Sequence, residues 1–130
     1  MSGFRFLSMD DFLAASEVAL EAVPQIRDWG LVDSALNRPR AIVFGEDVYP
    51  GLFSKAAALL HSLVTNHALV DGNKRSSLGA VWLFLAFNGQ HLQGTDDDRY
   101  RLILDVAEGH LRELADIAER LQGLCSPLNE

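Results

Sequence analysis

The residues best suited to chemistry lie together in one short stretch that begins at His67 and ends at Arg75. Its polar and glycine positions are His67, Asp71, Gly72, Asn73, Lys74 and Arg75. The segments before and after it are strongly apolar, and a simple connector between them needs only a few turn residues. An imidazole, a carboxylate, an amide and two cations gathered in so short a loop therefore indicate a catalytic or binding site.

These side chains suit phosphoryl transfer, in which a protein contributes mainly positioning and charge neutralisation. A neutral imidazole at His67 can take the proton of an attacking hydroxyl near neutral pH. The Asp71 carboxylate is a hard oxygen ligand that can hold one magnesium ion against phosphate oxygens. We therefore predict His67, Asp71 and Arg75 as the catalytic residues, with Asp71 as the metal ligand.

A predicted phosphate-binding set overlaps with these residues. Gly72 allows a positive φ angle or a close approach of the backbone to a ligand. Backbone N–H groups from Asn73 onward begin a predicted helix and can hold an anion. Lys74 adds a point charge, and Arg75 adds a two-pronged donor. We predict Gly72, Asn73, Lys74 and Arg75 as the residues that bind phosphates of a nucleotide.

Each of these residues also has a purely structural interpretation. His67 can be a helix cap or a surface ring, and Asp71 can be a turn residue. Asn73 is a favoured N-cap whether or not a ligand binds. Lys74 and Arg75 can form a solvated first turn, although two cations there oppose the helix dipole and fit better with a bound polyanion.

The stretch resembles the motif of the Fic/Doc superfamily, in which a histidine, an aromatic residue two positions later, an acidic residue, a small residue and Asn-Lys-Arg follow in that order. The similarity is to the Doc branch, the toxins of Phd/Doc toxin–antitoxin systems. It includes the flanking segments at 36–40, 45–50 and 84–89 and extends over about residues 28–118. Leu69 stands where the aromatic residue is usual, so we expect a slightly looser loop. Ala15 and Ser16 stand where many Doc-like chains carry a histidine.

Two positions separate the branches of this superfamily. Adenylylating Fic enzymes have a glycine where this chain has Lys74 and a second arginine where it has Leu78. The resemblance therefore implies the Doc activity: a protein kinase that uses ATP and Mg²⁺ and transfers the γ-phosphate to a threonine of elongation factor Tu, which inhibits translation. Two alternatives remain open, namely transfer of AMP to a protein hydroxyl and a non-catalytic module that binds an anion or a partner.

The resemblance implies one kind of partner, while the composition disfavours two others. Doc-like toxins are silenced by a Phd-like antitoxin whose disordered tail folds onto the toxin, so we expect a hydrophobic groove between helices.

The net charge of −7 disfavours binding to nucleic acid or to an anionic membrane surface. The longest apolar run, from Leu78 to Phe87, has about half of the roughly 20 residues that a membrane-spanning helix needs.

Composition also predicts the organisation and location of the chain. Its 130 residues are 48% hydrophobic and contain no Pro/Gly/Ser-rich divider, so we predict a single domain over residues 1–130. The first residues lack the apolar core and cleavage site of a signal peptide. The single cysteine, Cys125, cannot form an internal disulfide. We therefore expect a cytoplasmic protein.

Apolar residues recur at helical spacing in most of the chain, which predicts an all-α fold of about five to six helices packed around a central buried helix. The expected helices begin after Ser8 and lie around residues 31–37, 50–66, 73–88, 96–108 and 110–122. The helix at 73–88 is apolar nearly all round, so we expect it at the centre. Pro50 suits the first position of the third helix. Arg38 should leave the α region because it precedes Pro39.

One segment, Ala41 to Tyr49, has β-prone character. It holds two short β-prone runs around a Gly-Glu-Asp turn, so we predict a small hairpin there and no other strand. The hairpin can be a plain connector, or a flap whose edge pairs with an extended target and positions the target hydroxyl. In the second case Ile42, Val43 and Phe44 would be the substrate-positioning residues.

Overall fold

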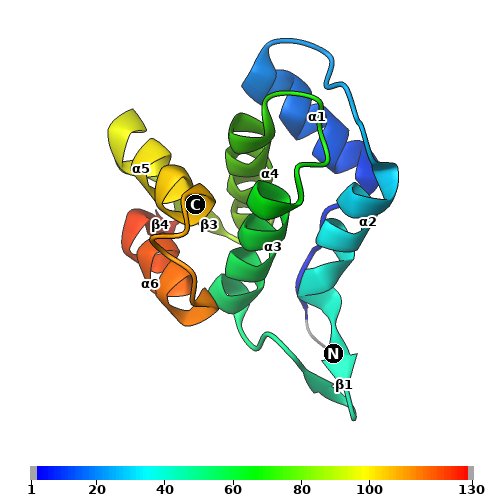
Figure 1. The fold of residues 1–130 in the computed structure, drawn as a ribbon. Helices are drawn as coiled ribbons and strands as arrows, with labels where there is room; N and C mark the ends of the chain where they lie inside the picture. Colours follow the sequence, from blue (N-terminus) through cyan, green and yellow to red (C-terminus); the bar gives the residue numbers. More distant parts are fainter. Residues whose placement is uncertain (1–2, 129–130) are drawn as a thin grey trace.

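The computed structural model describes residues 3–128. Within that range the chain forms six α-helices and one turn of 3₁₀ helix (Figure 1). Their bounds are α1 (Met9–Leu20), α2 (Trp29–Asn37), η1 (Arg38–Arg40), α3 (Leu52–Asn66), α4 (Asn73–Phe87), α5 (Asp96–Ala107) and α6 (Leu114–Leu124). The predicted all-α helical bundle is confirmed. No helix in the described range is long and apolar enough to cross a membrane.

The centre of the bundle is formed by α3 and α4, the two longest helices. In Figure 1 α1 and α2 lie on one side of this pair, and α5 and α6 lie on the other. Nine of the 15 residues of α3 are buried, compared with six of the 15 in α4. Trp82 of α4 remains 44% exposed. The predicted central helix at 73–88 is confirmed as α4, which packs against α1, α3 and α5 and shares the centre of the bundle with α3.

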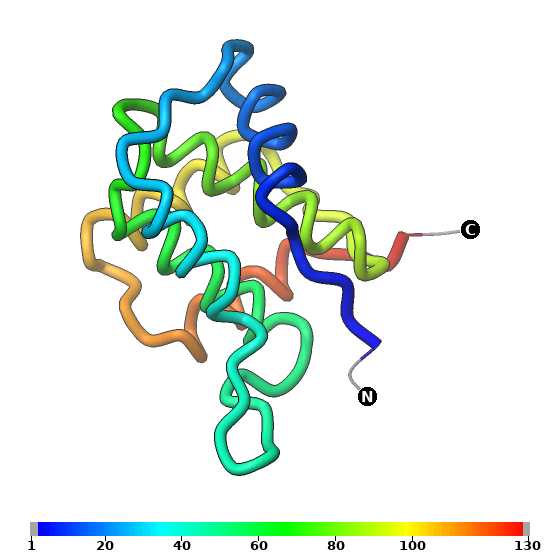
Figure 2. Tube along the Cα trace, turned by 90° about the vertical axis from the view of Figure 1, so that its right-hand side faces the viewer, coloured from blue at the N-terminus to red at the C-terminus, as the bar shows by residue number. Residues whose placement is uncertain are grey.

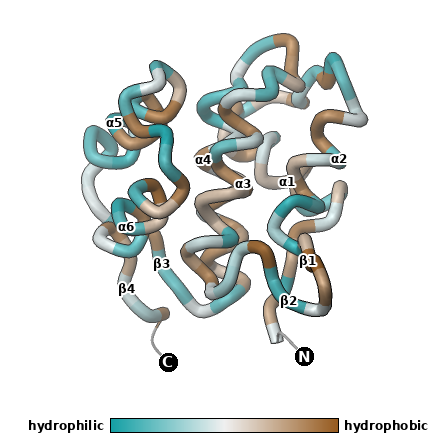
Figure 3. Tube along the Cα trace, turned by 60° about the horizontal axis from the view of Figure 1, so that its bottom comes forward, coloured by the Kyte–Doolittle hydropathy of each residue, from teal (hydrophilic) through white to brown (hydrophobic). Residues whose placement is uncertain are grey.

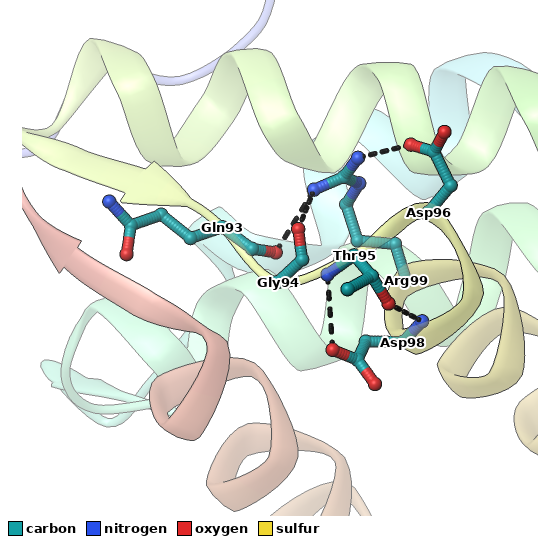
Figure 4. A network of polar contacts seen from close by, with 6 residues as sticks. All are labelled: Gln93, Gly94, Thr95, Asp96, Asp98 and Arg99. Atoms are coloured by element: carbon teal, nitrogen blue, oxygen red, sulfur yellow. Dashed lines mark hydrogen bonds and ion pairs between the residues drawn. The ribbon is translucent and has the colours of Figure 1, made fainter.

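Side-chain caps fix the start of three helices: Ser8 caps α1, Asp28 caps α2 and Thr95 caps α5. Ser8 caps α1 through a bond from the Asp11 N–H to its hydroxyl (3.0 Å), and the Asp11 carboxylate accepts from the Ser8 N–H (2.9 Å). This reciprocal arrangement confirms the predicted start after Ser8. Figure 4 shows the same capping box formed by Thr95 and Asp98 at the start of α5. There Arg99 also donates to two backbone carbonyls that precede the helix.

The connection after α2 differs from its predicted form. Arg38 keeps α-helical angles (φ −54°, ψ −45°) even though it precedes a proline, and the chain continues into the 3₁₀ turn η1. Its guanidinium donates to the Tyr49 hydroxyl and to the Ser62 hydroxyl, each at 2.9 Å. These tertiary hydrogen bonds hold a conformation that the following proline alone disfavours.

The predicted hairpin is present, with β1 (Ile42–Val43) antiparallel to β2 (Glu46–Asp47). Its turn lies at Phe44 and Gly45 (φ 52° and 78°) and not at Gly-Glu-Asp, because a two-residue loop with positive φ matches the twist of the strands. The hairpin projects from the helices in Figure 2, and Figure 3 shows β1 in hydrophobic colours.

A second pair of strands was not predicted. β3 (Gln90–Leu92) pairs antiparallel with β4 (Cys125–Pro127), so His91 lies opposite Ser126. This pairing ties the segment after α4 to the segment after α6. Three-residue strands so far apart in sequence leave no period-two pattern to detect, and the expectation of a single strand segment is therefore wrong.

Two helix boundaries also differ from those predicted. Pro50 precedes the N-cap of α3, which is Gly51 at φ 83°, so the proline is not the first helical residue. α6 begins at Leu114, four residues after the expected start at His110. The Asp105 carbonyl accepts hydrogen bonds from the N–H groups of residues 110 and 111 (2.9 and 3.0 Å), which holds this segment as a loop that closes α5.

Candidate active site

The loop between α3 and α4 contains the residues that the sequence singles out. His67 is the C-cap of α3 and has left-handed backbone angles (φ 51°, ψ 47°). Gly72 is the N-cap of α4 and is also left-handed (φ 80°). Two left-handed residues reverse the chain between antiparallel helices within a few positions. The end of α3 therefore faces the start of α4 across a small space.

That space is a pocket of about 320 Å³. It is lined by the predicted residues His67, Asp71, Gly72, Asn73, Lys74 and Arg75, together with Val64, Val70, Tyr100 and Ala107. All the loop residues predicted from the sequence therefore border one cavity. The wall from α5 was not predicted, because Tyr100 and Ala107 lie more than 20 positions beyond the motif and carry no local signal.

The three predicted flap residues lie elsewhere. Ile42, Val43 and Phe44 are exposed (62%, 54% and 101%) and do not line this pocket. The hairpin adjoins the N-terminal end of α3, whereas His67 follows its C-terminal end (Figure 1). A 15-residue helix is about 22 Å long, so the structure does not bring the hairpin to the pocket.

His67 and Asp71 differ in how their side chains are held. The His67 ring is exposed and forms no hydrogen bond with any residue between 3 and 128, while its backbone carbonyl accepts from the Arg27 guanidinium. One oxygen of the Asp71 carboxylate accepts from the Gly72 N–H at 2.8 Å. The imidazole is thus free to meet a hydroxyl, and the second oxygen of the exposed Asp71 carboxylate has no hydrogen-bond partner among the described residues.

Asn73 is the first residue of α4 and not its cap. Its amide oxygen accepts from the Leu69 N–H (3.0 Å), and its amide nitrogen donates to the Leu69 carbonyl (3.1 Å). The side chain therefore braces the loop, and only its backbone N–H points along the helix axis as an anion donor. Because the cap is Gly72, which has no side chain, no side-chain cap occupies the first N–H groups of α4.

The loop is also held from its other side by the segment between α1 and α2. Ile26 and Leu69 form an antiparallel bridge. The N–H groups of residues 27 and 28 donate to the Ala68 carbonyl (2.7 and 3.0 Å), and Val70 N–H donates to the carbonyl of residue 25 (2.9 Å). No motif in the sequence marks residues 25–28 as part of the site. Leu69 is 2% exposed, so it anchors the loop in the core although it is aliphatic.

Arg75 borders two further cavities besides the pocket. One is a groove of about 760 Å³ between α1, α4 and the start of α5. Its lining is mostly apolar: Ala14, Ala15, Val18, Ala19, Leu78, Gly79, Trp82, Leu83 and Leu92, with Arg75, His91, Asp96 and Arg99 at its edges. Leu78 therefore faces the groove and does not line the pocket. A smaller cavity of about 240 Å³ lies beside the end of α1.

The donor set of the pocket fits a nucleotide with a magnesium ion. Nowhere between residues 3 and 128 do three His, Cys, Asp or Glu side chains gather around a common point, so any metal here would have Asp71 as its one carboxylate. Mg²⁺ in nucleotide sites is typically held by one or two carboxylates, phosphate oxygens and water. Lys74, Arg75 and the start of α4 supply positive potential for the phosphates.

Two comparisons with known proteins bear on this site. The sequence model described as the Fic/DOC family matches residues 6–85, which include the whole loop. A curated protein named Toxin Doc, from Mycolicibacterium smegmatis, is 43% identical over 122 residues. That alignment covers 93% of this chain and 94% of the relative.

Proposed function

The chain belongs to the Fic/DOC family, and on that premise we propose that it is the toxin of a toxin–antitoxin pair that acts as a protein kinase. In this proposal it transfers the γ-phosphate of ATP to a threonine hydroxyl of elongation factor Tu and thereby inhibits translation. The observation that carries the proposal is the pocket in which His67, Asp71, Lys74 and Arg75 meet at the uncapped start of α4.

The proposed chemistry assigns one role to each group. His67 takes the proton of the threonine hydroxyl as its oxygen attacks the γ-phosphorus, the bond from phosphorus to the bridging oxygen breaks, and ADP leaves. Arg75, Lys74 and the N–H groups at the start of α4 hold the phosphates and neutralise their charge. When bound, Mg²⁺ on Asp71 would draw further negative charge from the phosphate oxygens.

Two residues favour phosphoryl transfer over the alternative, transfer of AMP. Lys74 lines the pocket where adenylylating relatives have a glycine, so its side chain occupies space that the nucleotide would need in their pose. Leu78 faces the apolar groove and offers no charge to a phosphate. The cations of the pocket are therefore Lys74 and Arg75, and the position of the second arginine of adenylylating relatives holds an uncharged residue.

The groove between α1 and α4 supports the proposed antitoxin partner. It is large and apolar, and two exposed side chains on its rim, Val18 (79%) and Trp82 (44%), lack cover from the rest of the described chain. An amphipathic segment of a Phd-like antitoxin would bury these side chains.

We expect Val18→Asp to weaken antitoxin binding at least tenfold in a titration while leaving the unbound toxin folded.

The decisive experiment incubates the purified chain with ATP, Mg²⁺ and elongation factor Tu and measures the intact mass of the target, with His67→Ala as control. We expect a gain of one phosphate that the control lacks. A gain of one nucleotide would replace the proposal with AMP transfer. Tight ATP binding with no modification of any tested protein would favour a non-catalytic binding module.

A further inference from the structure

Among residues 3–128, no side chain forms a hydrogen bond that could orient the ring of His67. A histidine that acts as a base is usually held by a hydrogen bond to its second ring nitrogen. Between residues 3 and 128 the structure contains no such bond to His67. The direction of the imidazole must therefore be set by the backbone at His67, and so by whatever fixes that backbone.

The backbone at His67 adopts a conformation that needs support. Its φ angle of 51° lies in the left-handed region, which costs a residue with a β-carbon about 1 kcal/mol or more. His67 also ends α3, where the last carbonyl groups of a helix have no partner within the helix. A donor at the His67 carbonyl would satisfy one of these groups and stabilise the left-handed turn.

Arg27 provides that donor. Its guanidinium donates to the His67 carbonyl. Its own backbone N–H donates to the next carbonyl, that of Ala68, at 2.7 Å. Arg27 thus holds two successive carbonyl groups of the loop, one through its side chain and one through its backbone. A cation is also well placed here, because the C-terminal end of a helix carries partial negative charge.

From this geometry we propose that Arg27 is a positioning residue for His67, a role that rests on His67 acting as the base of the proposed reaction. The guanidinium fixes the left-handed turn that presents the ring to the pocket. Removing the side chain leaves the backbone bonds at residues 25–28 in place, so the loop should remain attached while the His67 turn becomes mobile.

The test compares phosphate transfer by the full chain with that of Arg27→Ala, Arg27→Lys and Arg112→Ala. Arg112 is the matched control, because its guanidinium also donates to a backbone carbonyl, that of Gly109 (2.7 Å), and it lines neither the pocket nor the two other cavities that Arg75 borders. We expect Arg27→Ala to lower kcat about 10- to 100-fold, as small displacements of a catalytic group do, with the KM for ATP within about twofold. Arg27→Lys should recover part of kcat, and Arg112→Ala should leave it unchanged.

A second measurement does not depend on catalysis. Backbone ¹⁵N relaxation should show greater fast motion at residues 67 and 68 in Arg27→Ala than in the unchanged chain or in Arg112→Ala. If the unchanged chain transfers no phosphate, the proposed function fails, and the relaxation data still decide whether Arg27 fixes His67. An active Arg27→Ala with unchanged kcat, or equal mobility at residue 67, would overturn the inference about Arg27.

Discussion

Two side chains of the candidate active-site loop, six positions apart, differ in what they contribute to the folded state. The ring of His67 has no hydrogen-bond partner among the described residues, whereas the amide of Asn73 forms two hydrogen bonds with the backbone of Leu69. Function and stability are therefore separable within this loop. Replacing His67, the proposed base, should therefore cost the fold little, whereas replacing Asn73, which braces the loop, should destabilise it.

This separation predicts a contrast between two alanine variants. Asn73→Ala removes both bonds to Leu69 and should lower the free energy of unfolding by about 1–2 kcal/mol. His67→Ala should change it by less than about 0.5 kcal/mol, because an exposed ring makes little contact, while abolishing phosphate transfer. Urea denaturation of both variants measures the difference. Equal losses would mean that the His67 ring packs against the protein.

A second prediction at the residue scale concerns pH. Burial, followed by the charge of nearby Arg38, lowers the pKa of His61 below its ordinary value of 6.5, and the His61 ring nitrogen lies 3.2 Å from the guanidinium. The unfolded chain therefore binds this proton more readily than the folded one. The stability that His61 contributes is complete above pH 6.5 and is lost as the pH falls through the lowered pKa.

The comparison with His61→Asn isolates this effect from the other titrating groups. From pH 7.5 to 5.5 the unchanged chain should lose more stability than the variant, as followed by urea midpoints at each pH. Parallel pH profiles for the two proteins would show that His61 keeps an ordinary pKa in the folded state.

At the scale of elements, Gly72 shapes the start of α4 in two ways. Gly72 supplies a left-handed N-cap (φ 80°), and a β-carbon there would come within 2.4 Å of a Leu20 methyl group of α1. Its lack of a side chain also leaves the first N–H groups of α4 uncapped. The packing of α1 on α4 and the anion site therefore rely on the same residue.

A comparison with Gly89 separates the cost of the left-handed backbone angle at Gly72 from the cost of the contact with Leu20. It has a similar φ angle of 85°, but a β-carbon there would meet no atom within 4 Å. We expect Gly89→Ala to cost about 1 kcal/mol from the backbone angle alone. Gly72→Ala should cost about 1 kcal/mol more, because the Leu20 side chain must move. Equal losses of stability would mean that Leu20 adjusts freely.

At the scale of the whole molecule, the hairpin is fastened to the core by a buried cation. Lys55 of α3 is 1% exposed, and its ammonium donates to the Asp47 carboxylate (3.1 Å) and to the Tyr49 carbonyl (2.6 Å). Asp47 itself is 36% exposed, so solvent screens part of the pair. This link sets where the hairpin sits relative to α3.

A substitution at Asp47 and a substitution at Lys55 should have very different effects on the free energy of unfolding. Asp47→Asn leaves a buried ammonium without its counter-charge and should cost about 1–3 kcal/mol, less than for a fully buried pair because Asp47 is partly solvated. Lys55→Met removes the buried charge and fills its space, so stability should change by less than about 1 kcal/mol. Thermal and urea unfolding compare the two. A larger loss in Lys55→Met would show that the pair is strongly stabilising.

The sequence was sufficient to predict most elements of the fold. Apolar spacing located the six α-helices of the described residues, although not η1, and the Ser8 capping signal placed the start of α1 correctly. It was also sufficient for the hairpin at residues 42–47, because a β-prone run interrupted by a turn is a local pattern. It failed for the angles of Arg38, where hydrogen bonds to distant residues decide the conformation, and for the start of α6, where the Asp105 carbonyl holds residues 110 and 111 in a loop.

The sequence by itself determined the candidate site, because His67 to Arg75 is one continuous stretch whose residue types and order carry the chemistry. Only the tertiary structure decided what surrounds that stretch. It placed Tyr100 beside the loop, put the hairpin at the far end of α3, and brought Arg27 to the His67 carbonyl. The physical reason is that residue order specifies local geometry, whereas contacts between distant segments depend on how the helices pack, which no local pattern encodes.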